Sequence, residues 1–60
     1  MAAERPVLIV DDDQDVRELL ADQLSVDGEF IAIQAASLRE AEEHLLAKDA
    51  RFDAIILDIA

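Results

Sequence analysis

VLIVDDD, residues 7–13, is the most informative segment of this 60-residue chain. Its four consecutive apolar residues are mostly β-branched, which predicts a strand buried on both faces, as in a parallel sheet. Pro6 fits just before such a strand, where a missing N–H does no harm. Three carboxylates follow the strand, and like charges this close repel one another unless a cation compensates them. The stretch therefore predicts a strand over about 7–11 that ends in an acidic site.

After this stretch the apolar period changes to that of a helix, expected over about 14–27. Asp12 or Asp13 would cap its first turn, and Gly28 is placed to end it in the left-handed conformation. Apolar residues recur at helical spacing and charged residues occupy the opposite side: Val16, Leu19, Leu20 and Leu24 against Asp15, Arg17, Glu18 and Asp22.

The remainder repeats the alternation of strand and helix. FIAIQA (30–35) predicts a second strand, less apolar than the first and so expected at an edge. Ser37 with Glu40 matches the capping box and opens a helix over about 38–48. AIILD (54–58) predicts a third strand, which again ends in a carboxylate, Asp58. We expect the leucines of both helices to lie in the core, namely Leu19, Leu20, Leu24, Leu45 and Leu46.

Strands separated by helices of this length predict right-handed parallel crossovers, and hence an α/β fold with a parallel sheet of order 2-1-3. Sites in such sheets lie beyond the carboxyl ends of the strands, where the strand order reverses. We therefore expect Asp11, Asp12, Asp13 and Asp58 to meet there. Hard oxygen ligands with room for water and phosphate are typical of a Mg²⁺ site.

Composition narrows the function classes. Fifteen Asp and Glu against five Lys and Arg give a net charge of -10, which argues against binding nucleic acid or an anionic membrane surface. The chain has no cysteine, so it has neither a disulfide nor a thiolate metal site. It contains no apolar run long enough to span a membrane and no signal peptide pattern, so we expect a cytoplasmic protein. His44 has no second His or Cys as a companion and is expected to be solvated.

In its order of VLIVDDD, helix, FIAIQAAS, helix and AIILD, the chain resembles the response regulator receiver domain of two-component signalling, which has a flavodoxin-like fold. The resemblance covers the N-terminal half of such a domain and essentially all of this chain. It implies that Asp58 accepts a phosphoryl group from a histidine kinase or phosphotransfer protein. It also implies that Asp11 and Asp12 hold Mg²⁺ together with Asp58 and the backbone carbonyl of Ala60, and leaves Asp13 as the helix cap.

The chain also departs from the receiver pattern. Receiver domains have five strands, with a Ser or Thr after the fourth and a Lys after the fifth. This sequence ends at Ala60, so we expect residues 1–60 to be an N-terminal part of a receiver domain that is not fully competent. We expect this chain to be a signalling phosphoacceptor and not an enzyme that acts on a separate substrate. The parent domain would catalyse its own phosphorylation and dephosphorylation.

Two alternatives remain open. Asp11 and Asp13 have the Asp-x-Asp spacing of a haloacid-dehalogenase-like phosphatase, although Asp15 stands where that family has Thr or Val. The chain could instead be an inert, self-associating module. For the receiver interpretation as for both alternatives, we expect residues 1–60 to self-associate, because the third strand would leave an apolar edge and helix faces uncovered.

Overall fold

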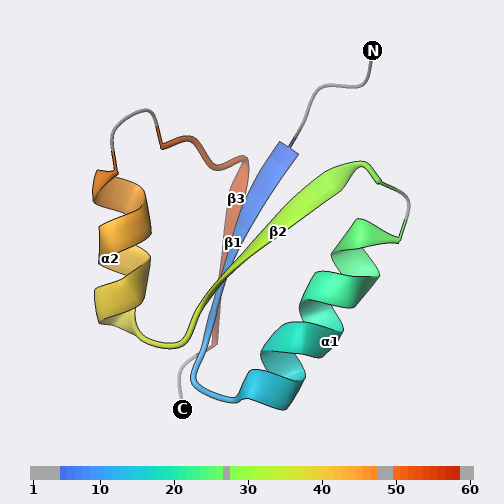
Figure 1. Cartoon of the computed structure of the whole chain (residues 1–60), viewed down its shortest axis with the longest axis horizontal. Coiled ribbons are helices and arrows are strands. Elements are labelled where there is room, and N and C mark those ends of the chain that lie inside the picture. Colours follow the sequence, from blue (N-terminus) through green and yellow to red (C-terminus); the bar gives the residue numbers. More distant parts are fainter. Residues whose placement is uncertain (1–4, 27, 48–49, 59–60) are drawn as a thin grey trace.

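The chain folds as three parallel strands and two helices in the computed structural model, which describes residues 5–26, 28–47 and 50–58 (Figure 1). The sheet has the order β2-β1-β3, and both pairings are parallel. This confirms the predicted α/β class, the alternation of strand and helix, and the strand order. The elements are β1 (Arg5–Asp11), α1 (Gln14–Ser25), β2 (Phe30–Ala35), α2 (Leu38–Leu46) and β3 (Ala54–Asp58).

The central strand β1 is covered on both faces, because α1 and α2 lie on opposite sides of the sheet (Figure 1). Alternate residues of β1 point to each face. Leu8 and Val10 pack with Ala41 of α2, whereas Val7 and Ile9 pack with Ala21 of α1. The consecutive apolar run of β1 is thus explained by burial on two faces rather than one.

Both helices begin with the predicted caps. The Asp13 carboxylate accepts hydrogen bonds from the backbone N–H groups of Asp15 (3.0 Å) and Val16 (3.3 Å). The Ser37 hydroxyl accepts one from the N–H of Glu40 at 3.2 Å. Glu40 completes the capping box in a modified form. Its carboxylate accepts a hydrogen bond from the N–H of Ala36, the residue before Ser37, rather than from the N–H of Ser37 itself.

The cap of α1 is tested by Asp13→Ala. We expect the free energy of unfolding to fall by about 0.5–2 kcal/mol, because two N–H groups of the first turn lose their acceptor. Urea unfolding followed by far-UV circular dichroism measures it. Asp12→Ala is the matched control, since Asp12 is exposed and its side chain makes no hydrogen bond to any described residue. Equal losses in both variants would contradict the assignment of the cap.

The predicted bounds of three elements need correction. β1 begins at Arg5 rather than at residue 7, because Arg5 and Pro6 already pair with β2. Proline is tolerated there because β3 begins opposite Val7, and the Pro6 carbonyl still accepts from the N–H of Asp53 at 2.8 Å. The helices α1 and α2 end at Ser25 and Leu46, two residues earlier than expected. Positions 27 and 48, where the helices were expected to end, lie outside the described residues.

Local geometry explains where the helices stop. Gly28 has φ +70°, as predicted, and its N–H bonds to the carbonyl of Ser25, closing a turn after α1. Ala47 is extended (φ -61°, ψ 143°), and its N–H bonds to the carbonyl of His44 at the end of α2. Both helices therefore end in turns stabilised by backbone hydrogen bonds.

The prediction that all five leucines are core residues is wrong for three of them. Leu20 and Leu24 pack against the α1-side core, but Leu19, Leu45 and Leu46 are exposed by 57%, 45% and 83%. The reason is the position of the helices over the sheet. No Cα atom of either helix lies within 8 Å of β3 in the described ranges, so leucines on the flanks of α1 and α2 have no strand beneath them.

Arg5 joins the starts of all three strands. Its guanidinium donates to Asp53, just before β3, at 2.8 Å and to Glu29, just before β2, at 2.9 Å. It also lies over the ring of Phe30, 5.1 Å from the centroid. The hydrogen bond to Asp53, followed by that to Glu29, raises the pKa of Arg5 above its ordinary value. The group is exposed, so the ion pairs stabilise the fold only slightly.

Candidate functional site

The carboxyl ends of β1 and β3 bring together the acidic residues that the sequence singled out. Asp11 and Asp58 are the last residues of their strands, and they are direct neighbours in the parallel register. Both strands end at the side of the sheet where α1 begins, near the bottom of Figure 1. Since β1 lies between β2 and β3, this is also the point where the strand order reverses.

Asp11 has the most unusual environment of these residues. It is a buried charged residue, only 4% exposed, among a core that is otherwise apolar. One carboxylate oxygen, Oδ1, accepts from the backbone N–H of Asp13 at 2.9 Å. The other, Oδ2, is buried and has no hydrogen-bond partner among the described residues. A buried acceptor without a partner costs about 1–3 kcal/mol, and more when charged, so Asp11 is set up to gain from a cation.

The other acidic residues are placed differently. Asp12 and Asp58 are exposed, so their carboxylates are open to solvent at the same edge of the sheet as Asp11. Asp13 is committed to capping α1. Ala60, whose carbonyl was expected as a further ligand, lies outside the described residues. The triple Asp thus divides into one buried, one exposed and one capping carboxylate.

A metal ion requires several donor atoms that lie close enough together to bind it. Among the residues described by the structure, no three His, Cys, Asp or Glu side chains are grouped closely enough to hold a metal ion by themselves. Mg²⁺ is commonly bound through one or two carboxylates while it keeps several waters and a substrate phosphate. The buried Oδ2 of Asp11, which has no partner within the described part of the chain, fits such a site. The Mg²⁺ assignment stays a prediction.

Arg17 is a residue of this edge that the sequence pattern misassigned to the solvent side of α1. It is half-buried, and its guanidinium donates to the backbone carbonyl of Asp11 at 2.8 Å and to the Gln34 side chain at 3.1 Å. It thereby ties α1 to the carboxyl ends of β1 and β2. The available signal was its spacing of four residues from Ala21, on the core-facing side of α1.

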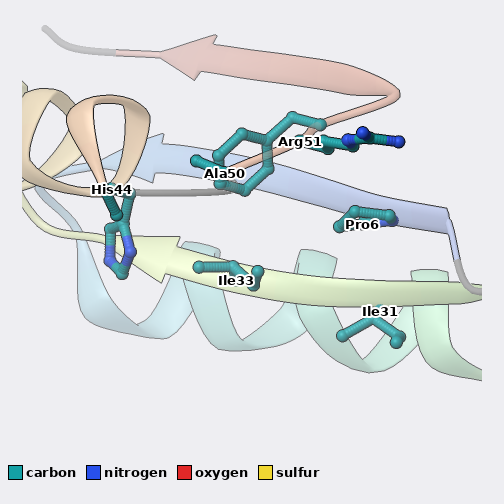
Figure 2. A pocket seen from close by; sticks show the side chains of 8 residues that line it. Pro6, Ile31, Ile33, His44, Ala50 and Arg51 are labelled. Carbon is teal, nitrogen blue, oxygen red and sulfur yellow. The ribbon is translucent and has the colours of Figure 1, made fainter.

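A groove of about 500 Å³ lies away from the carboxylates. His44 projects from α2 toward β2, on which Ile31 and Ile33 line the groove, and Pro6 lines it from β1 (Figure 2). His44 is half-buried, so its position is less solvated than expected. Pro6 and Ile31 are the second residues of their strands, which places the groove at the amino ends of the strands, opposite to the acidic edge.

Comparisons with known proteins found no match to a family model, to a curated protein or to a solved structure. Neither α1 nor α2 is long and apolar enough to cross a membrane, within the part of the chain that the structure describes.

Proposed function

We propose that this chain is the phosphoacceptor module of a two-component response regulator, in which Asp58 takes a phosphoryl group from a histidine kinase or a phosphotransfer protein. An oxygen of the Asp58 carboxylate would attack the phosphorus of a phosphohistidine. The new P–O bond forms as the P–N bond breaks, and the departing imidazole takes up a proton. The product is an acyl phosphate on Asp58.

The environment of Asp11 is the observation that carries this proposal. Its Oδ2 is buried and has no partner among the residues that the structure describes, and it lies at the end of β1, next to the end of β3 where Asp58 is exposed. We assign Asp11 and Asp12 as the side chains that would hold Mg²⁺, together with Asp58. When bound, the cation would neutralise charge so that an anionic carboxylate can approach an anionic phosphoryl group.

Phosphorylation by a small donor tests the proposal directly. The chain is incubated with acetyl phosphate in the presence of Mg²⁺ or of a chelator, and its intact mass is recorded. We expect one added phosphoryl group with Mg²⁺ and none with the chelator, because the cation would neutralise charge between the carboxylate and the phosphoryl group. The transfer breaks the P–O bond of acetyl phosphate and releases acetate. Continuous release of inorganic phosphate that depends on Asp11 would instead indicate phosphatase chemistry. No labelling and no release would indicate an inert module.

The cation site is tested by Asp11→Asn. In the absence of metal we expect the free energy of unfolding of this variant to be no lower than that of the wild type. The substitution removes a buried charge, although the amide group that replaces Oδ2 also lacks a partner among the described residues. Mg²⁺ at a hundredfold excess over its Kd should stabilise the wild type by about 2.7 kcal/mol and leave the variant unchanged. Urea unfolding with and without Mg²⁺ measures both effects.

Asp22→Asn is the matched control for this experiment, since it removes one negative charge from an exposed position of α1. Its unfolding should respond to Mg²⁺ as the wild type does. If Asp11→Asn were destabilised and still stabilised by Mg²⁺, Asp11 would be a structural carboxylate and the cation would be bound elsewhere.

A further inference from the structure

Arg17 is a half-buried cation at the acidic edge that forms no ion pair with any described carboxylate. Two neutral acceptors hold its guanidinium instead. Nη1 donates to the backbone carbonyl of Asp11 at 2.8 Å, and Nε donates to the side-chain oxygen of Gln34 at 3.1 Å. The N–H groups of arginine form a rigid planar fork, so two bonds to different strands fix the guanidinium in place.

Two of the three oxygen atoms of Asp11 have hydrogen-bond partners. The backbone oxygen accepts from Arg17, and Oδ1 accepts from the N–H of Asp13 at 2.9 Å. The third oxygen, Oδ2, is buried and has no partner among the described residues. The backbone and the side chain of Asp11 are therefore each held by a bond, and Oδ2 is the oxygen that is left for a ligand in the described part of the chain.

The segment from Asp11 to Arg17 forms a closed turn. The backbone N–H of Arg17 bonds to the carbonyl of Asp13 at 3.0 Å, while its side chain reaches back to the carbonyl of Asp11. Because a peptide unit is planar, fixing the carbonyl of Asp11 also fixes the direction of the N–H of Asp12. Arg17 thus holds the peptide that joins the two side chains assigned to Mg²⁺.

We propose that Arg17 is a positioning residue for the cation site, which holds Asp11 so that Oδ2 can bind Mg²⁺ without rearrangement. This role rests on the proposed function, since it concerns the same site. Arg17 acts through the Asp11 carbonyl and touches neither the cation nor the phosphoryl group. Partners that orient a metal ligand are typically worth about 10–100-fold in metal affinity. We expect the lower end, about tenfold, because Arg17 bonds to the backbone and not to the carboxylate.

The charge of Arg17 acts on cation binding in the opposite direction to its hydrogen bonds. A guanidinium at the acidic edge repels a divalent cation, so removal of the charge alone would tighten Mg²⁺ binding. This repulsion is weakened because Arg17 is only half-buried, and charges near the surface interact through a high effective dielectric constant. We therefore expect the loss of the hydrogen bonds to dominate. The sign of the change in Kd separates a positioning role from a purely electrostatic one.

An NMR titration of the 60-residue chain with MgCl₂ tests the proposal. Arg17→Met keeps the apolar stem and removes the donors, and we expect its Kd for Mg²⁺ to be about tenfold higher than that of the wild type. Arg17→Lys keeps the charge but cannot span both acceptors with one nitrogen, so its Kd should lie between the two. Arg39→Met is the matched control, because it removes the same charge from an exposed position of α2. It should change the Kd by less than about twofold.

A measurement on the metal-free chain provides a readout that does not depend on Mg²⁺. The N–H of Asp13 donates to Oδ1 of Asp11, so it should exchange with solvent faster when Arg17 no longer holds Asp11. We expect faster exchange in Arg17→Met and unchanged exchange in Arg39→Met. Gln34→Leu, at an exposed position of β2, leaves Arg17 with one acceptor and should give a smaller increase in both the exchange rate and the Kd.

A folded Arg17→Met protein that binds Mg²⁺ as tightly as the wild type, or more tightly, would overturn the positioning role and leave the cation site in place. Equal weakening in Arg17→Met and Arg39→Met, or unchanged exchange of the Asp13 amide, would also overturn it. If Arg17→Met does not fold, an unchanged Kd in Gln34→Leu has the same meaning. A wild-type chain that binds no Mg²⁺ would instead refute the proposed cation site, and the role of Arg17 with it.

Discussion

Asp58→Asn is expected to abolish labelling of the chain by acetyl phosphate. Asparagine keeps the shape of the side chain but replaces the anionic oxygen nucleophile by a neutral amide, which cannot form a stable acyl phosphate. Asp58 is exposed, so the substitution should leave the fold intact. The measurement is the intact mass after incubation with acetyl phosphate and Mg²⁺, with far-UV circular dichroism to confirm folding.

The control for this variant is Asp22→Asn, an exposed carboxylate of α1 that lies outside the acidic edge. It should be labelled as fully as the wild type. Labelling that persisted in Asp58→Asn, or that fell equally in both variants, would mean that acetyl phosphate modifies surface carboxylates without selection. The proposed role of Asp58 would then be wrong, whatever the behaviour of Asp11.

Leu8→Ala is expected to remove most of the stability of the fold. Leu8 is fully buried in β1, between Val10, Ala35 and Ala41, with Phe52 packed against the cluster. Truncating a buried leucine to alanine typically costs about 2–5 kcal/mol. A domain of this size has only roughly 3–9 kcal/mol in total, at 0.05–0.15 kcal/mol per residue. We therefore expect a large shift of the urea midpoint, or a chain that is partly unfolded without denaturant.

Leu46→Ala is the matched substitution for Leu8→Ala, because it removes the same atoms from a side chain that is 83% exposed. Its free energy of unfolding should stay within about 0.5 kcal/mol of the wild type. Similar losses in the two variants would mean that β1 is not the centre of the packed core.

The order of the elements could be predicted from the sequence because local patterns determine it. The apolar run 7–10 specified a strand buried on two faces, and Asp13 and Ser37 marked the first turns of the helices. The exposure of Leu19 and Leu45 could not be predicted. Helical periodicity identifies the apolar side of a helix, but it carries no information about how far the sheet extends beneath that side.

The acidic edge was predictable only in outline. Parallel strands that both end in a carboxylate must bring those residues to one edge, and the register of Asp11 with Asp58 follows from it. The different roles of the first three carboxylates depend on local geometry. The burial of Asp11 arises because it still belongs to the central strand, and the position of Arg17 depends on how α1 packs. Neither can be derived from residue spacing alone.

The sparse packing on β3 in the described structure affects how the acidic edge would respond to a ligand. Asp11 belongs to β1, the most buried strand, and Asp58 belongs to β3, the most exposed strand. Therefore β3 can unfold locally while the helices stay packed on β1 and β2. Backbone amides of β3 should therefore exchange with solvent sooner than those of β1. A cation bound by both Asp11 and Asp58 would link the stable strand β1 to the less stable strand β3. Cation binding would therefore order β3.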